Sequence, residues 1–376
     1  MTRSCHICTH ILTALPTACG LSWNHAALDF NHSRVECGTS VPLDNVVLIL
    51  GAPRSGTSWL GKIFDSHPDV LYRHEPDIAL REPRLPLIIR TEDSAQYTDI
   101  AAAYLDRLLS ASTIKATVKL PVFAKSYRPW ALGLLYQAMV QSARLLAGTP
   151  ATDRFGAIGL PDLFKVDRHP QLRFVMKTVT ALGRVGVFLR AVPTMRVIFL
   201  LRHPGGQVAS MLRGMRLGKM QTLDGLTKVV ARNLVAARYG LSSQSLAKAS
   251  PVDQWAWHWV IMNELALEAL AAQGRGRTCV VTYEDICCDP IGWAKVLFDF
   301  GSLRWNHQTE KFVNRSIQGQ RRESYYGVFH SPAEVVNRWR LELDTCDRQA
   351  IADILQQTEL ARYWPDESGA IGGSRV

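Results

Sequence analysis

The sequence predicts an α/β fold, with a single domain built on a central parallel sheet that is flanked by helices. Short apolar runs, of which NVVLIL at 45–50 and MRVIFLL at 195–201 are the clearest, alternate with segments of helical periodicity. Apolar runs without polar alternation are typical of parallel strands that are covered by helices on both faces. The 376 residues are 47% hydrophobic, which is enough for a large core.

The first half of the chain contains three of the expected strands. Each is a short apolar run, and the first helix ends near Pro68 because proline cannot continue a helix. In chain order we expect a strand at 45–50, a helix at 57–66, a strand at 70–73, a proline-rich loop region at 76–93, helices beginning near 97 and 131, and a strand at 172–177.

The second half contains the other two strands and most of the helices. Pro193 ends one helix, whereas Pro251 and Pro290 mark helix starts, since proline is tolerated in the first helical turn. In chain order we expect a helix at 183–192, a strand at 195–201, a helix at 205–215, a helical region at 222–273, a strand at 278–284, and helices at 290–300, 332–341 and 346–360.

The loop after the first strand, GAPRSGTSWL, has the spacing of a phosphate-binding loop. Gly51 and Gly56 stand where the G-x-x-x-x-G-K-[ST] motif of P-loop NTPase-like folds has its glycines, between a strand and a helix. Thr57 replaces the lysine of that motif, and Arg54 supplies a permanent positive charge from within the loop. The N-terminus of the following helix adds positive potential where an anion would bind.

The stretch PRSGTSWL resembles the 5′-phosphosulfate loop of sulfotransferases that use 3′-phosphoadenosine 5′-phosphosulfate (PAPS) as donor. The resemblance implies that five loop residues hold the phosphosulfate: Arg54, Ser55, Gly56, Thr57 and Ser58. It also implies that Trp59 stacks on the adenine. The residues alone leave open the alternative that Trp59 anchors its helix in the core.

Later segments extend the resemblance over about residues 45–340. In RVIFLLRHPGGQVASML, Arg202 and Ser210 have the offset of the family's 3′-phosphate motif, although the usual Arg-Asp-Pro has become Arg-His-Pro. The segment TYEDICCDP resembles the family's Tyr-Glu-Asp…Asp-Pro segment. Arg321 and Arg322 resemble the basic late segment that closes over the 3′-phosphate, but their neighbours differ from the family pattern.

A hydroxyl acceptor needs a general base within hydrogen-bond reach, and the segment LYRHEPD offers two candidates. The resemblance to carbohydrate-type sulfotransferases favours Glu75, with His74 second; the alternative for both is a purely structural role. Lys177, at the end of another strand, is a candidate contact of the sulfate or the acceptor, or else a solvated lysine. Arg54 is expected to neutralise charge that develops at the leaving phosphate, so we expect no metal requirement.

The motifs divide the chain into three parts. We expect a weakly structured extension at 1–44, the sulfotransferase domain at 45–365 and a flexible tail at 366–376. Within the domain, the helical region 77–170 is expected to shape the acceptor side. Cys5 and Cys8 have the spacing of a zinc pair, but no second pair follows at zinc-finger spacing, so no metal site is expected.

The formal net charge of +10 suits an anionic partner. We expect PAPS as co-substrate and a carbohydrate or another hydroxylated small molecule as acceptor, and no nucleic acid partner. No run of 18 apolar residues is present, which predicts the absence of a membrane span. Polar residues interrupt the apolar stretch at the N-terminus, so the expected location is cytoplasmic.

Two other function classes remain open from the residues. A P-loop kinase or NTPase would place a lysine at position 57 and a magnesium-binding carboxylate at a strand end; Thr57 argues against it. A non-catalytic protein that binds anions or glycans would keep the basic cleft without needing a base.

Overall fold

The computed structural model describes residues 45–117, 120–146, 169, 171–220, 233–273, 276–318 and 332–365. These residues all belong to one compact unit, Thr39–Val376. The extension expected at 1–44 and the tail expected at 366–376 lie outside the described residues, as do Arg321 and Arg322.

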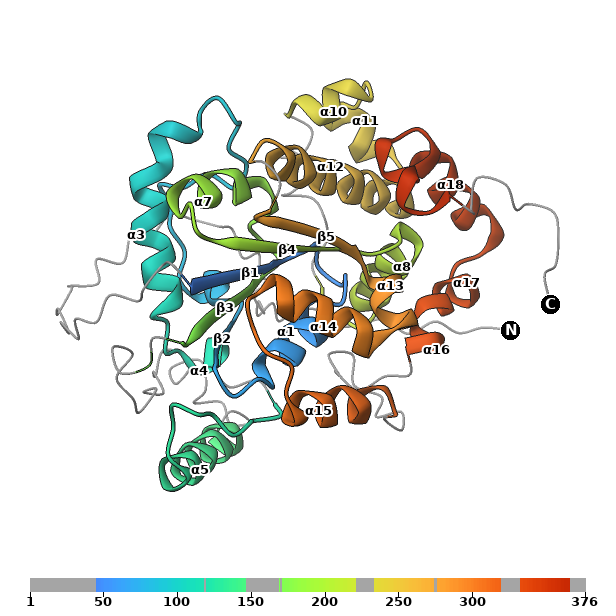
Figure 1. Ribbon diagram of the computed structural model, residues 1–376. Helices are drawn as coiled ribbons and strands as arrows, with labels where there is room; N and C mark the ends of the chain where they lie inside the picture. Colours follow the sequence, from blue (N-terminus) through green and yellow to red (C-terminus); the bar gives the residue numbers. More distant parts are fainter. Residues whose placement is uncertain are drawn as a thin grey trace, which may run out of the picture. The chain divides into compact units, whose positions relative to one another are not determined.

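A five-stranded parallel sheet runs through this unit (Figure 1). Its strands are β1 (Val46–Leu50), β2 (Val70–His74), β3 (Arg173–Thr178), β4 (Arg196–Leu201) and β5 (Thr278–Thr282). They lie in the order β2-β3-β1-β4-β5, and each neighbouring pair is parallel. The predicted α/β fold with a central parallel sheet is therefore confirmed.

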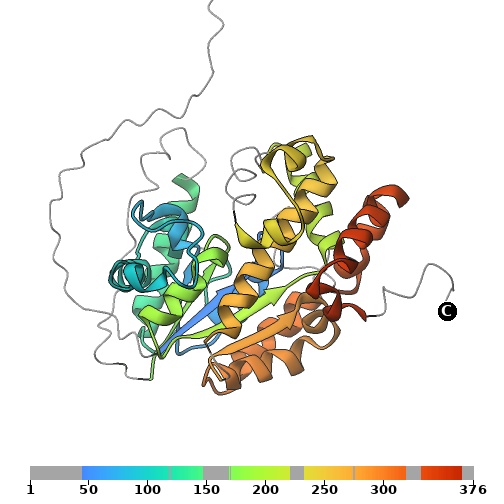
Figure 2. The ribbon, with the colours of Figure 1, turned by 90° about the horizontal axis from the view of Figure 1, so that it is seen from above.

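Helices cover both faces of the sheet, as two perpendicular views show (Figures 1 and 2). One face packs against α3 (Thr98–Leu109), α7 (Val185–Ala191) and α12 (Pro251–Ala271). The other packs against α1 (Thr57–Asp65), α14 (Pro290–Phe300) and α15 (His307–Ile317).

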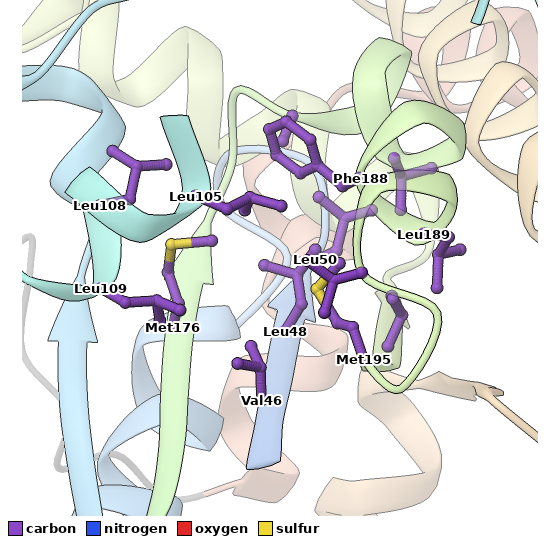
Figure 3. Packing of buried hydrophobic residues seen from close by; sticks show 14 of the residues in the cluster. Val46, Leu48, Leu50, Leu105, Leu108, Leu109, Met176, Phe188, Leu189 and Met195 are labelled. Atoms are coloured by element: carbon purple, nitrogen blue, oxygen red, sulfur yellow. The ribbon is translucent and has the colours of Figure 1, made fainter. Parts of the chain in front are cut away.

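The central strand β1 is buried on both faces. Leu48 and Leu50 belong to one cluster together with Met176 of β3 and Phe188 of α7 (Figure 3). Ile49 points to the opposite face, because side chains alternate along a strand, and it belongs to the cluster formed with α1 and α14. Burial on both sides explains why this strand is a continuous apolar run.

The described ranges contain further α-helices beside these elements. They are α2 (Pro76–Ala79), α4 (Ile114–Thr117), α5 (Trp130–Leu146), α8 (Pro204–Arg216), α10 (Leu234–Arg238), α11 (Ser243–Lys248), α13 (Tyr283–Cys288), α16 (Pro332–Asn337), α17 (Trp339–Glu342) and α18 (Thr345–Gln356).

Some predicted elements have wrong bounds, among them one strand and one helical region. The strand expected at 278–284 ends at Thr282, because the Thr282 hydroxyl accepts a hydrogen bond from the Asp285 backbone N–H and caps α13. The helical region expected at 222–273 consists, in its described part, of α10, α11 and α12. It is broken near Gly240, whose φ of 65° does not fit a right-handed helix.

None of the helices in the described ranges combines the length and the apolar character of a membrane span. Nor does the described part of the chain contain a group of three or more His, Cys, Asp or Glu side chains arranged to hold a metal ion.

Candidate active site

The carboxyl ends of the five strands meet at one edge of the sheet, and the predicted motif residues follow them. β1 lies between β3 and β4, so the connections that follow β1 and β4 lead to opposite sides of the sheet. Such a switch point is where parallel sheets bind ligands. In the strand register His74 pairs with Lys177, and Leu50 pairs with both Thr178 and Phe199. The segments that follow the strands therefore lie at one edge of the sheet.

The loop between β1 and α1 is tightly folded. Arg54 and Gly56 both have positive φ angles, of 71° and 95°, and Gly56 is the N-cap of α1. The Ser55 hydroxyl donates to the Ala52 carbonyl at 2.6 Å. A Cβ atom on Gly51 would lie 2.5 Å from a β4 carbonyl oxygen. Because the first N–H groups of a helix lack acceptors within it, this turn presents backbone donors to an anion.

Tyr283 packs directly against the loop. A Cβ atom on Gly56 would lie 2.3 Å from the Tyr283 ring, so only glycine fits there. The guanidinium of Arg202 lies 4.9 Å from the centroid of the same ring. Tyr283 therefore joins the loop to the segment that follows β4.

Hydrogen bonds connect the loop after β1 to the segment that follows β4. Arg54 Nε donates to Ser210 Oγ at 2.9 Å, and Arg202 Nη1 donates to the Arg54 carbonyl at 2.8 Å. Gln207 Nε2 donates to the Pro53 carbonyl at 3.0 Å. The residues of these three pairs are 156, 148 and 154 positions apart in sequence. Segments that are distant in the chain thus form one cluster of hydrogen-bonding side chains.

Arg202 is held in place but keeps one unused donor. Its Nη2 donates to the Val335 carbonyl at 3.3 Å, and its own carbonyl accepts from Trp259 Nε1 at 3.1 Å. Its Nε is buried without a hydrogen-bond partner in the described structure. A Cβ atom on Gly206 would approach that Nε to 2.8 Å, so the glycine keeps the space beside it open.

His203, which replaces the family's aspartate, caps α8. Its Nδ1 accepts a hydrogen bond from the Gly205 N–H at 3.1 Å, as an aspartate oxygen would. The ring stacks on Trp339 with centroids 4.6 Å apart. The backbone N–H of His203 donates to Glu284 Oε1 at 3.1 Å. The departure from the family pattern therefore preserves the helix start.

Glu75 and Lys177 form a pair at the ends of β2 and β3. The Lys177 ammonium donates to Glu75 Oε1, and the Glu75 N–H donates to the Lys177 carbonyl at 2.7 Å. Glu75 has a φ of 48°, which turns the chain out of the strand. Burial lowers the pKa of Lys177, the Glu75 charge opposes this shift, and the nearby charge of Arg54 adds to it. Lys177 is thus a buried cation within electrostatic reach of both Glu75 and Arg54, not a solvated lysine.

His74 lies beside this pair. Its Nδ1 is hydrogen-bonded to the Tyr72 hydroxyl at 2.9 Å, and its Nε2 lies 3.9 Å from Glu75 Oε2. Tyr72 and His74 share a face of β2 because they are two residues apart. The ring of His74 is therefore oriented toward the carboxylate by a buried tyrosine.

Residues 46–307, more than half of the chain, match the model of the sulfotransferase family. The chain belongs to this family. The match confirms the resemblance to PAPS-dependent sulfotransferases, and it favours sulfuryl transfer over the phosphoryl transfer of a kinase or NTPase.

Similar proteins carry the same family name. Human carbohydrate sulfotransferase 6 is 26% identical over 309 residues, which cover 78% of this chain and 74% of the human protein. The sulfotransferase domain of the Synechococcus PCC 7002 olefin synthase is 18% identical, with a TM-score of 0.42 over 83% of this chain and 93% of that domain. A mouse sulfotransferase in complex with PAP is 11% identical, with a TM-score of 0.39 over 86% and 89% of the two chains.

In this sulfotransferase, Trp59 is half-buried between two other elements. Its Nε1 donates to Ser316 Oγ of α15 at 3.0 Å, and its ring meets Tyr283 edge to face with centroids 6.1 Å apart. These contacts are those of a residue that anchors α1, while adenine stacking stays a prediction. The prediction for Arg321 and Arg322 concerns residues that the structure does not describe.

Several residues that contact the candidate site were not among the predicted ones. Tyr283 stood in the third motif, and Gln207 lies between Arg202 and Ser210, so the motifs contained a signal for both. Tyr72 precedes His74 by two residues in a strand, which places both side chains on one face. Trp339 had no sequence signal, since its contact with His203 depends on the fold of a distant segment.

Proposed function

We propose that this sulfotransferase moves the sulfuryl group of PAPS to a hydroxyl group of a carbohydrate, with Glu75 as general base. The observation that carries the proposal is the direct contact between the motifs. Arg54 donates to Ser210, and Arg202 donates to the loop carbonyl of Arg54. One cluster of cations and hydroxyls thus lies at the switch point of the sheet, next to the Glu75–Lys177 pair.

The residues of this cluster fit a donor with two phosphate-containing groups. Arg54 and the backbone N–H groups at the start of α1 would hold the 5′-phosphosulfate. Ser210 and Arg202 would hold the 3′-phosphate. The buried Nε of Arg202 has no hydrogen-bond partner in the described structure, and leaving a buried donor unpaired is costly, so an incoming phosphate oxygen would satisfy it.

The Glu75–Lys177 pair fits the transfer step. The acceptor oxygen attacks sulfur while its proton passes to the Glu75 carboxylate, and the bond from sulfur to the 5′-phosphate oxygen breaks. Protonation of Glu75 removes the negative charge that holds the Lys177 ammonium. The lysine charge then stabilises the negative charge that develops on the leaving phosphate, together with Arg54. His74, oriented by Tyr72, would support the carboxylate from its Oε2 side.

A carbohydrate is the acceptor class with the most support. The human relative that matches 78% of this chain is named a carbohydrate sulfotransferase. The formal net charge of +10 favours association with glycans that already carry carboxylate or sulfate groups.

The acceptor and the metal requirement can be tested together. The protein is incubated with labelled PAPS and a panel of glycans, phenols and lipids, with and without EDTA. We expect label transfer to a glycan that EDTA leaves unchanged, because cations of the protein replace a metal. Transfer only to phenols or lipids would overturn the acceptor class, and loss of transfer in EDTA would overturn the metal-independent mechanism.

The residue roles can be separated by binding and turnover. Arg54→Ala and Arg202→Ala should each weaken binding of adenosine 3′,5′-bisphosphate about tenfold or more, since each removes a charged hydrogen-bond donor. Glu75→Gln should leave this affinity unchanged and abolish most turnover. Glu268→Gln, a carboxylate change on the exposed side of α12, is the matched control and should retain both. Full turnover in Glu75→Gln would remove Glu75 as the base.

A further inference from the structure

Arg213 lies on α8, one helical turn after Ser210, and its guanidinium faces that serine. Its Nη2 is 3.5 Å from Ser210 Oγ, the same hydroxyl oxygen that accepts from Arg54 Nε. About a quarter of the Arg213 side chain is exposed, so an incoming ligand can reach it. Two arginines of different segments therefore flank one hydroxyl group.

A carboxylate on α17 fixes the orientation of Arg213. Its Nη1 donates to both oxygens of Glu342, at 2.5 Å to Oε2. Arg338 Nε donates to the same carboxylate. The single negative charge of Glu342 is therefore shared by two guanidinium groups, and the three side chains keep a net positive charge beside Ser210.

α17 is held against the start of α8, so Glu342 is a fixed anchor. Trp339 stacks on His203, and a Cβ atom on Gly205 would lie 2.5 Å from the Trp339 ring. The preceding helix α16 accepts a hydrogen bond from Arg202 through the Val335 carbonyl. The position of Arg213 is thus set by contacts independent of any ligand.

We propose that Arg213 is a further binding residue for the 3′-phosphate of the donor, positioned by Glu342; this rests on the proposed placement of that phosphate at Arg202 and Ser210. A phosphate oxygen that accepts from the Ser210 hydroxyl lies about 2.7 Å from Oγ. Since Arg213 Nη2 lies 3.5 Å from the same Oγ, the oxygen comes within hydrogen-bonding or close electrostatic range of the guanidinium. The net positive charge of the Arg213–Glu342–Arg338 group complements the dianionic phosphate.

The test compares two ligands that differ only in the 3′-phosphate. Affinities for adenosine 3′,5′-bisphosphate and adenosine 5′-monophosphate are measured by calorimetry on the full chain, and their ratio isolates the contribution of the 3′-phosphate. Arg213→Ala removes the guanidinium. Arg213→Gln keeps a hydrogen-bond donor for Glu342 and removes only the charge, so it protects the test against loss of folding. Arg238→Ala is the control, because Arg238 is a half-exposed arginine that pairs with Glu264 and Glu268 of α12 and not with Glu342.

We expect the affinity ratio to fall about tenfold in Arg213→Ala and several-fold in Arg213→Gln, with monophosphate affinity unchanged, since one charged contact is lost. Arg238→Ala should keep the wild-type ratio. An unchanged ratio in both Arg213 variants, or an equal loss for the two ligands, overturns the role of Arg213 and leaves the proposed function intact. A wild-type protein that does not distinguish the two ligands overturns the 3′-phosphate site itself.

Discussion

Unusual backbone angles mark two of the site residues individually. Within the described ranges, three residues other than glycine have positive φ angles: Arg54, Glu75 and Ser302. Such angles cost free energy and persist where the surrounding structure enforces them, which is frequent at functional sites. The sequence could predict Gly56 from the motif, but not these angles, because nothing in an arginine or a glutamate favours a left-handed conformation.

Gly56→Ala should destabilise the protein and abolish donor binding. The new Cβ atom would lie 2.3 Å from the Tyr283 ring at a φ of 95°, so the loop must move away from its place. We expect a loss of about 3 kcal/mol or more in the free energy of unfolding, from the combined backbone strain and overpacking. Denaturant titration and calorimetry with adenosine 3′,5′-bisphosphate measure the two effects.

Gly240→Ala is the control that tests the backbone strain of a positive φ angle without a steric clash of the new Cβ atom. Gly240 also has a positive φ, of 65°, but a Cβ atom there would meet nothing within 4 Å. Gly240→Ala should lower the free energy of unfolding by only about 1–2 kcal/mol, which is the cost of the left-handed backbone angle alone. Equal losses in the two variants would contradict the proposed packing of Tyr283 on the loop.

At the scale of elements, the sequence predicted the strands better than the helices. All five strands lie within about two residues of their expected places, because a buried apolar run with flanking turn residues is a local signal. Helix α15 at His307–Ile317 was missed, and the single helix expected at 332–341 is divided into α16 and α17. α16 has six residues and packs against α13, whereas α17 has four residues and packs against α8. Helices this short depend on such contacts more than on local periodicity.

The cap of α8 gives a test at this scale. His203→Ala removes both the acceptor of the Gly205 N–H and the stacking on Trp339, and should lower the free energy of unfolding by about 2 kcal/mol, of which the N-cap contributes about 1 kcal/mol. His203→Asp restores a capping oxygen but loses the stacking on Trp339, so its stability should lie between those of the alanine variant and the wild type. Thermal unfolding of the three proteins measures this order. An aspartate variant no more stable than the alanine variant would contradict the capping role.

At the scale of the molecule, the strand order is what the sequence could not provide. The sequence predicted a parallel sheet, whose strands share one direction and so place the loops that follow them at one edge. It did not predict that β1 would lie between β3 and β4, nor that Arg54 would contact Ser210. Such pairings join segments far apart in the chain, and no local pattern encodes which segments pair.

The stability of the whole domain should depend on pH through His258 in α12. Burial lowers the pKa of His258 from 6.5 to about 4. Between these values the unfolded chain takes up a proton that the folded protein does not, so the free energy of unfolding falls as the pH decreases from 6.5 to 4. The titration of His258 alone lowers the free energy of unfolding by on the order of 3 kcal/mol over this pH range.

His258→Gln should flatten this part of the pH profile, since glutamine does not titrate. Denaturant unfolding at pH 7.5 and at pH 4.5 measures the difference, with the exposed His307→Gln as control. If the stability of His258→Gln falls with pH as steeply as that of the wild type, groups other than His258 cause the loss of stability in acid.

The position of β1 in the middle of the sheet also bears on how this enzyme can change. Arg202 and Ser210 follow β4, on one side of β1, whereas Glu75 follows β2 and Lys177 lies near the end of β3, on the other side. The second side is supplied by one continuous stretch of chain, from Val70 to Thr178. An exchange of that one segment between relatives would replace the proposed base and its surroundings and leave Arg54, Arg202 and Ser210 in place. With the base placed as we propose, acceptor preference would diverge, or could be engineered, without a change in the residues proposed to hold the sulfate donor.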